Sequence, residues 1–194
     1  CILMHCSPLF SQKYSKQAST SLNAMSKAVP FLLNPDNTNG LIGSVGFDPL
    51  GFSDNFYIKW LQESEIKHGR VAMLATVGFV TSEFVTFPMF SDMQVDDSNM
   101  APSAIGMSAM MQIIFAAGVE EWRTNKGKMT MDDMFSDPDR VPGEIGFDPA
   151  GYFKKSSAEE LNKLKLQEIK NGRLAMLAIG GMIHHNFVTG EPLL

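Results

Sequence analysis

Two short stretches of the chain carry the same potential ligand side chains in the same order, about a hundred residues apart. Residues 65–75 read EIKHGRVAMLA and residues 168–178 read EIKNGRLAMLA, and nine of these eleven positions are identical. In each copy a Glu is followed after three residues by a His or an Asn, and after five residues by an Arg. Carboxylate, imidazole and carboxamide groups can each donate an electron pair to a metal ion, and a guanidinium can neutralise a carboxylate. The pattern therefore predicts a charge-balanced ligand site in each copy.

Helical geometry predicts which Glu pairs with which Arg. Five residues along a helix place Glu65 and Arg70 about 140° apart around the axis, so they point to different faces. This favours partners in the other copy, Glu65 with Arg173 and Glu168 with Arg70. Small residues lie on the face of each Glu, and these are Gly69, Ala72 and Thr76 in the first copy and Gly172 and Ala175 in the second. Because small residues let helices approach closely, we expect two helices that cross there as a pseudo-two-fold pair.

The remaining donors indicate the kind of metal that such a site would bind. His68 and Asn171 are uncharged, and a Glu that is paired with an Arg adds no net charge to the site. Such ligands suit the axial position of a magnesium ion that a tetrapyrrole ring already holds by its own nitrogens. A bare Mg²⁺ ion prefers clustered carboxylates and waters, which the pattern lacks. The alternative is that the ion pairs only lock the two helices together.

Weaker candidates follow outside the repeated stretches. Gln112 and Glu120 lie about 80° apart around a helix, and Arg123 follows Glu120 by one turn, where it can balance the charge. Gln112 could equally form a hydrogen bond between helices. His184 and His185, near the end of the second repeated helix, could simply be interfacial.

Helices are expected to position these residues, and turn signals mark where they begin. Each copy starts with a Gly-Phe-Asp-Pro turn, at residues 46–49 and 146–149, because Pro fixes φ and Gly accepts tight backbone positions. Ser157 and Glu160 form a capping-box pattern before the last helix, and Pro102 suits the first turn of the middle helix. The fold class predicted is all-α, with helices over residues 56–88, 101–123 and 158–188.

Apolar runs and loop charges favour helices that cross a membrane. A span needs about 20 mostly apolar residues; residues 71–90 contain a single charged residue and residues 101–119 contain none. Residues 174–188 reach span length only together with residues 168–173. The connector 91–100 has no Lys or Arg, whereas the second connector and the N-terminal region carry several. This alternation predicts three transmembrane helices, with the N-terminus on the positive side.

Composition and the N-terminal region narrow the class further. A net charge of −5 argues against a nucleic-acid partner. Both cysteines lie within the first six residues, so no disulfide can staple the rest of the chain. Residues 1–24 are Ser-rich, basic and free of acidic residues. We expect residues 1–26 to be a mobile arm or the remnant of a plastid transit peptide, and residues 27–194 to form the folded domain.

The combined motifs resemble the light-harvesting chlorophyll-binding family. They read GFDP…E-x-x-H-G-R-x-A-M-L, then Q-x7-E-x-x-R, then GFDP…E-I-K-N-G-R-L-A-M-L, and the resemblance runs from about Lys27 to Pro192. It implies an all-α membrane protein in which the first and third of three helices cross through Glu–Arg pairs. It also implies axial ligands to chlorophyll magnesium, which are Glu65, His68, Gln112, Glu120, Glu168, Asn171 and His185. The turns at Asp48 and Asp148 resemble the loops that hold carotenoid end groups.

The opening SKAVPFLLNP and the compact middle region look more like algal fucoxanthin-chlorophyll a/c or red-lineage antennae than plant proteins. This implies chlorophyll a, chlorophyll c and fucoxanthin-type carotenoids as cofactors. The expected function is a binding scaffold without catalysis that transfers excitation energy to photosystem I or II. The expected place is the plastid thylakoid membrane, with a stromal N-terminus and with lipids and other antenna subunits as partners.

Two other functions are compatible with parts of this pattern. A photoprotective relative that dissipates excitation would share every ligand named above, and acidic residues on the lumenal side, Asp92, Asp96 and Asp97, could sense pH. A di-iron carboxylate membrane enzyme is the second alternative, because Glu-x-x-His on paired helices is typical of such bundles. Asn171 in place of the second His, and an Arg that competes for each Glu, argue against it.

Overall fold

The computed structural model describes residues 25–85, 99–137, 140–149, 151 and 155–191. Within these residues the chain forms helices and no strand, apart from one isolated antiparallel bridge between Met25 and Leu33. The elements in chain order are η1 (Asp36–Thr38), α1 (Phe52–Asn55), α2 (Ile58–Phe84), α3 (Ala101–Ile105), α4 (Met107–Thr124), α5 (Met131–Met134) and α7 (Ala158–Thr189). The prediction of an all-α fold is confirmed for this part of the chain.

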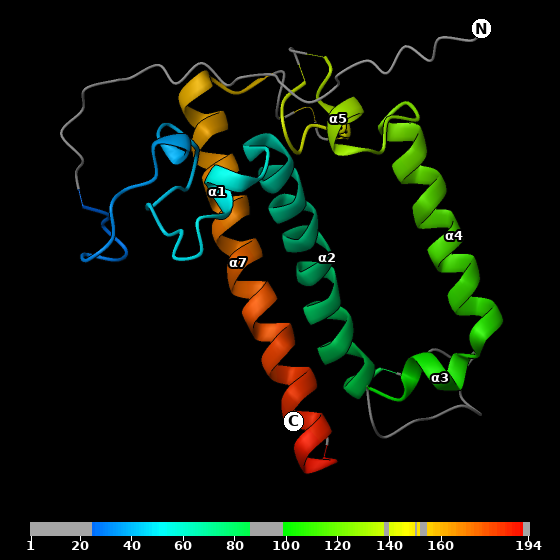
Figure 1. The fold of residues 1–194 in the computed structure, drawn as a ribbon. Helices are drawn as coiled ribbons and strands as arrows, with labels where there is room; N and C mark the ends of the chain where they lie inside the picture. The colour runs from blue at the N-terminus through cyan, green and yellow to red at the C-terminus, as the bar shows by residue number, and fades with distance from the viewer. Residues whose placement is uncertain (1–24, 86–98, 138–139, 150, 152–154, 192–194) are drawn as a thin grey trace, which may run out of the picture.

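The two long helices, α2 and α7, pack against each other along the centre of the molecule (Figure 1). They approach so closely that a Cβ atom added to Gly69 would lie 3.0 Å from the Cα atom of Gly172. Both glycines are buried, as are Ala72 on α2 and Ala175 on α7. The helices therefore meet at the small-residue seam that the helical wheel predicts.

The start and the end of α7 follow local sequence signals. Ser157 and Glu160 form the predicted capping box, in which each side chain accepts a hydrogen bond from the backbone N–H of the other residue. The helix ends before Gly190, whose φ of 66° lies in the left-handed region. Glycine adopts this conformation without strain and commonly terminates helices.

The middle helix differs from its prediction. The expected single helix over residues 101–123 is divided at Gly106, whose φ of 93° and ψ of 153° are incompatible with a helix, into α3 and α4. A glycine can adopt this conformation because it has no Cβ atom. Pro102 lies in the first turn of α3, as predicted.

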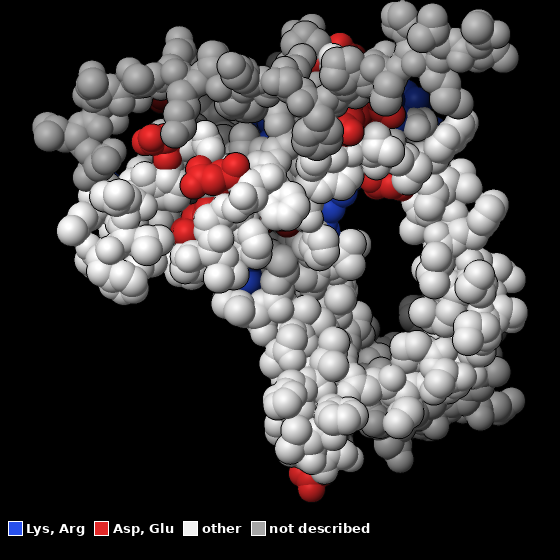
Figure 2. Space-filling view, in the orientation of Figure 1, with Lys and Arg blue, Asp and Glu red and all other residues white. Residues whose placement is uncertain are grey.

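Helix α4 stands apart from the α2–α7 pair. It is joined to the pair at one end through α3 and lies near α5 at the other end (Figure 1). All residues from 111 to 120 are exposed, and the space-filling view shows an opening between α4 and the pair (Figure 2). The fold thus presents side chains of α4 and of α2 to a common space.

Helix lengths and hydropathy differ from the membrane prediction. Within the described residues, no helix is both long enough and apolar enough to cross a membrane. The division at Gly106 leaves α4 with 18 residues, and α2 ends at Phe84, before the predicted residue 88. Residues 86–88 lie outside the described part of the chain. The prediction of three spans is therefore not confirmed by these helices.

The predicted arm can be compared with the structure only at its end. Residues 1–24 lie outside the described residues, but Ser26 is 3% exposed. Its hydroxyl donates a hydrogen bond to the carbonyl of Gly46 at 2.5 Å and accepts one from the N–H of Ala28 at 3.2 Å. Ser26 therefore belongs to the folded part, because its hydroxyl ties the chain to the first Gly-Phe-Asp-Pro loop.

Candidate pigment-binding site

Two reciprocal ion pairs join α2 to α7 at the glycine seam. Arg70 Nε donates to Glu168 Oε1 at 2.7 Å, and Arg173 Nε donates to Glu65 Oε1 at 2.6 Å. These are the partners expected from the helical wheel, and neither Glu pairs with the Arg of its own helix. Within the described residues, the second oxygen of each Glu, Oε2, accepts no hydrogen bond. Each pair therefore presents an electron-pair donor that carries no net charge.

Each arginine also binds a backbone carbonyl in a loop that precedes a helix. Arg70 donates to the carbonyl of Gly143 at 2.9 Å, and Arg173 donates to that of Gly43 at 2.8 Å. Both glycines have a φ near 80°, and a Cβ atom on Gly143 would lie 2.8 Å from Ile66 Cδ1. A side chain at this position would thus be strained as well as crowded. These acceptors were not predicted, although the pattern G-x-x-G-F-D-P occurs in both copies.

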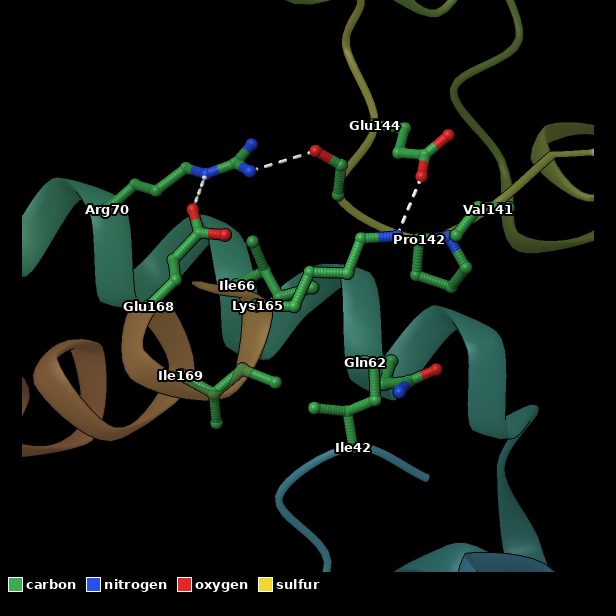
Figure 3. Close-up of a pocket in the computed structure, with 11 residues that line it drawn as sticks. Ile42, Gln62, Ile66, Arg70, Val141, Pro142, Glu144, Lys165, Glu168 and Ile169 are labelled. Carbon is green, nitrogen blue, oxygen red and sulfur yellow. Dashed lines mark hydrogen bonds and ion pairs between the residues drawn. The ribbon is translucent and has the colours of Figure 1, made fainter. Parts of the chain in front are cut away.

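The surroundings of the two ion pairs differ. Beside Arg70 and Glu168 lies a small cavity of about 90 Å³, near which Lys165 donates to Glu144 at 2.8 Å (Figure 3). Beside the other ion pair lies a larger groove of about 620 Å³, lined mainly by apolar side chains of the first loop and of α2, and by Asp48. The pseudo-two-fold pair therefore offers two binding spaces of unequal size.

His68 is held in one orientation by the helix on which it lies. Its Nδ1 atom is 2.7 Å from the backbone carbonyl oxygen of Ser64, one turn earlier on α2. A carbonyl oxygen can only accept, so Nδ1 carries a proton, and in the neutral ring the lone pair is then on Nε2. Metal-binding histidines commonly donate their other ring N–H to such a carbonyl, which fixes the ring orientation. The exposed His68 side chain therefore presents an oriented nitrogen donor.

The other predicted ligands are exposed and do not form a cluster. Asn171 lies on α7 one residue before the buried Gly172, His185 lies near the end of the same helix, and Gln112 lies on α4. Arg123 donates to one carboxylate oxygen of Glu120, Oε2, from Nη2 at 2.7 Å and from Nε at 3.1 Å, so the charge of Glu120 is balanced as expected. The structure does not bring the α4 residues into hydrogen bonds with the predicted ligands of α2 and α7, within the described residues.

The donor arrangement fits a metal that brings most of its own ligands. In the part of the chain that the structure describes, no three His, Cys, Asp or Glu side chains gather where they could hold a metal ion. A magnesium ion in a tetrapyrrole ring needs only one further donor from the protein. The exposed His68 and the half-buried Glu65, which Arg173 neutralises, are single donors that match this requirement.

Asp48 organises the first Gly-Phe-Asp-Pro loop. Its carboxylate accepts hydrogen bonds from the backbone N–H groups of Phe52 at 2.9 Å and Ser53 at 2.8 Å, and from the Ser53 hydroxyl at 2.5 Å. Partial burial raises the pKa of the Asp48 carboxyl, but these hydrogen bonds outweigh it and hold the pKa below its ordinary value. The N–H of Gly51 donates to the Asp48 carbonyl at 3.4 Å, and the equivalent glycine donates to Asp148 at 3.3 Å. The two loops therefore share one backbone arrangement.

Asp48→Asn should lower stability in a pH-dependent way. A group whose pKa is depressed by folding contributes stability above its unfolded pKa, about 4, and loses it as the pH falls through the folded value. We expect a loss of about 1 kcal/mol at neutral pH, which shrinks as the pH is lowered below about 4. The measurement is the free energy of unfolding of the Asp48→Asn variant and of the natural chain, in mild detergent at several pH values. Asp36→Asn, at an exposed site, controls for the lost charge. If the loss of stability in Asp48→Asn did not change with pH, the stabilising role assigned to the Asp48 carboxylate would be contradicted.

Comparison with known proteins identifies the family of this chain. A family model described as "Chlorophyll A-B binding protein" matches residues 34–187. The chain therefore belongs to the chlorophyll a/b-binding protein family, the light-harvesting class that the motifs resemble.

Several curated relatives specify the similarity further. The chain is 39% identical over 157 residues to light-harvesting complex stress-related protein 1 of Chlamydomonas reinhardtii, with 73% of this chain and 60% of the relative covered. It is 34% identical over 172 residues to a fucoxanthin-chlorophyll a-c binding protein of Chattonella marina var. antiqua, covering 79% and 72%. A protein of the same name from Isochrysis galbana is 30% identical over 194 residues, covering 89% and 91%. The match thus spans about three fifths of the stress-related relative.

Proposed function

We propose that this chain is a light-harvesting antenna subunit, which binds chlorophylls and carotenoids and transfers excitation energy to a photosystem. The observation that carries the proposal is the reciprocal pairing of Glu65 with Arg173 and of Glu168 with Arg70. In each pair, one carboxylate oxygen accepts no hydrogen bond among the described residues. The pair as a whole carries no net charge. Bound chlorophyll supplies light absorption, and the protein supplies fixed positions for it. No residue is assigned a catalytic role.

The proposed axial ligands to chlorophyll magnesium come from all three long elements. On α2 and α7, Glu65 and Glu168 are oriented by the ion pairs, and His68 is oriented by its hydrogen bond to the helix backbone. On α4 they lie on a helix that is exposed over residues 111–120. The proposed set is Glu65, His68, Gln112, Glu120, Glu168, Asn171 and His185.

His68→Leu should remove one chlorophyll per chain and largely keep the fold. The substitution deletes the Nε2 donor but leaves the ion pairs and the glycine seam unchanged. The measurement is the chlorophyll content per protein after purification in mild detergent, together with far-ultraviolet circular dichroism. His184→Leu, at another exposed histidine, should retain every chlorophyll. An unchanged chlorophyll content in His68→Leu would show that His68 is not a ligand.

Carotenoids are proposed to bind where the loops of Asp48 and Asp148 meet the helix pair. The groove of about 620 Å³ beside the Glu65–Arg173 pair is lined mainly by apolar side chains and ends at the first loop. This suits a long apolar molecule with a polar end group. The relatives named as fucoxanthin-chlorophyll a-c binding proteins support chlorophyll a, chlorophyll c and a fucoxanthin-type carotenoid as the pigments.

The proposed place is the plastid thylakoid membrane, with the N-terminus on the stromal side. Charged residues gather at the end of the molecule near α1 and α5, whereas the lower parts of the helices are almost uncharged on the visible face (Figure 2). Large apolar side chains there are exposed, among them Leu74 at 76%, Leu177 at 78% and Phe187 at 82%. Lipids and pigments would cover such surfaces. Partners proposed on the same grounds are other antenna subunits and the core of photosystem I or II.

The experiment that tests energy transfer is the fluorescence excitation spectrum of the purified complex. Emission is recorded at the chlorophyll a band while the excitation wavelength is scanned through carotenoid absorption. We expect carotenoid bands in the excitation spectrum, because pigments held at close and fixed distances transfer excitation. A complex whose carotenoids absorb but contribute nothing to chlorophyll emission would contradict the antenna proposal.

A second candidate function is the dissipation of excess excitation. Its support is the 39% identity to a protein named as stress-related. The acidic residues proposed to sense lumenal pH, Asp92, Asp96 and Asp97, lie outside the described residues. The fluorescence lifetime of the purified complex at neutral and acidic pH distinguishes the functions: a marked shortening on acidification favours dissipation, and a constant lifetime favours harvesting.

A further inference from the structure

Some of the most buried polar side chains lie away from the reciprocal ion pairs. Glu63 on α2 is 2% exposed and Asn125, which follows α4, is 1% exposed. Glu63 accepts a hydrogen bond from the N–H of Gly143 at 2.6 Å and lies 3.5 Å from a guanidinium nitrogen of Arg140. Arg140 in turn donates to the side-chain oxygen of Asn125 at 2.7 Å. These contacts join α2, the end of α4 and the loop before α7.

A second set of contacts completes this cluster. Lys67, one turn after Glu63 on α2, lies 3.2 Å from its carboxylate and also forms an ion pair with Glu121 on α4. The Asn125 amide donates to Glu121 at 2.7 Å. We name the five side chains Glu63, Lys67, Glu121, Asn125 and Arg140 the polar clamp. Every member is bonded to at least one other member, so the cluster is a connected network.

An aromatic side chain lies against the Arg140 end of the polar clamp. Met134 of α5 is 3% exposed and the adjacent Phe135 is 8% exposed. The Phe135 ring lies 5.6 Å from the ring of Tyr57, and the Arg140 guanidinium lies 5.7 Å from the Phe135 ring centre. Exclusion of water strengthens hydrogen bonds and ion pairs within such a network. This applies to Glu63 and Asn125, whereas the Lys67 and Glu121 side chains are 28% and 37% exposed.

The rest of α4 has few alternative restraints. Within the described residues, no other hydrogen bond or ion pair links α4 to α2 or α7. Residues 111–120 are exposed, and α4 begins at Gly106, where the helix is interrupted. The clamp is thus the polar contact between α4 itself and α2, while Asn99, before α3, donates to Ile183 and Asn186 of α7 at the other end.

The internal repeat shows that the clamp belongs to one copy only. Lys67 corresponds to Lys170 in the second copy, whereas Glu63 corresponds to Leu166. Lys170 is exposed and forms no ion pair among the described residues. The pseudo-two-fold pair could accept a third helix on either side, and Glu63 provides the polar anchor on one side alone.

We propose that the polar clamp fixes the distance between two chlorophylls, one on His68 and one on Glu120. The reason is the position of the Lys67–Glu121 ion pair: Lys67 directly precedes His68, and Glu121 directly follows Glu120. The clamp residues act as positioning residues, because they tie the two ligand-bearing backbones together and do not themselves ligate. This proposal rests on the proposed pigment-binding function and adds the residues that set the coupling between two pigments.

The test compares Lys67→Met with Lys170→Met, its counterpart in the other copy, and with the conservative Lys67→Arg. The first readout is visible circular dichroism, whose paired bands report excitonic coupling, in preparations of known chlorophyll content. The second readout needs no pigment. It is the distance between nitroxide labels at Lys59→Cys on α2 and Val119→Cys on α4, measured by pulsed electron paramagnetic resonance. Cys1 and Cys6 are replaced by Ser in these samples so that only the introduced cysteines are labelled. Glu121→Gln provides a milder second variant should Lys67→Met fold poorly.

We expect Lys67→Met and Glu121→Gln to keep their chlorophylls but to lose amplitude in the paired bands, and to broaden the label distance. Lys170→Met and Lys67→Arg should match the natural chain in both readouts. An unchanged label distance and unchanged bands in Lys67→Met would overturn the proposal. A colourless natural chain would instead reject the proposed function, while the label distance would still show whether the clamp positions α4.

Discussion

Arg70→Leu is expected to destabilise the complex strongly. The substitution removes the charge that neutralises Glu168 and one donor to the Gly143 carbonyl. Removing one partner of a buried ion pair costs about 3–5 kcal/mol, because the other charge is left uncompensated. The side chains of this pair are about a third exposed in the protein alone, so we expect a loss of about 3 kcal/mol. The measurement is the free energy of unfolding in mild detergent, followed by circular dichroism.

Two further variants separate the cross-helix pairing from a general charge effect. Lys165→Leu breaks the Lys165–Glu144 ion pair near the same cavity, and exposed pairs of this kind contribute only about 0.2–1 kcal/mol. The double variant Arg70→Leu with Glu168→Gln removes both charges and should regain much of the lost stability. Equal losses from Arg70→Leu and Lys165→Leu would show that the pairing does not have the role assigned to it.

Gly69→Val is expected to separate the two long helices. A Cβ atom on Gly69 would already lie 3.0 Å from the Gly172 Cα atom and 3.6 Å from its carbonyl carbon, both backbone atoms. Overpacking in a core typically costs about 1–3 kcal/mol, and a backbone neighbour cannot rotate away as a side chain can. We therefore expect a loss of about 3 kcal/mol or more, with release of the pigments bound between the helices. The measurements are the free energy of unfolding and the chlorophyll content.

Gly78→Ala provides the matched control on the same helix. Apart from its chain neighbours and the nearby backbone of its own helix, no atom of the described residues lies within 4 Å of a Cβ atom built on Gly78. Alanine favours a helix over glycine by about 1 kcal/mol, so this variant should be as stable as the natural chain or slightly more stable. A comparable loss in both variants would indicate that α2 tolerates no substitution of glycine, and would contradict the close contact as the cause.

The helix pair could be predicted from the sequence because its determinants are periodic and repeated. Glu65 and Arg173 lie on helix faces that the 3.6-residue period defines, and the second copy provides the same argument independently. The capping box at Ser157 is a local pattern with a local physical cause. Such features do not depend on where distant parts of the chain lie.

Other features depend on tertiary structure and left little signal. Gly106 divides the predicted middle helix, but an isolated glycine is also tolerated within helices, so its position alone did not indicate a break. Glu63 and Asn125 are buried because Arg140 and the loop at Gly143, which are distant in the sequence, fold against them. Nothing periodic in the sequence marks those partners, and the polar clamp was therefore not predicted.

The central claim is that the neutralised carboxylates and His68 hold magnesium tetrapyrroles. Its most direct test is purification of the chain in mild detergent from the pigmented membrane, followed by pigment extraction and an absorption spectrum. We predict a coloured preparation in which several chlorophylls and at least one carotenoid accompany each chain, and in which Arg70→Leu reduces that content more than Lys165→Leu. A colourless preparation, or one that contains stoichiometric iron in place of chlorophyll, would contradict the claim.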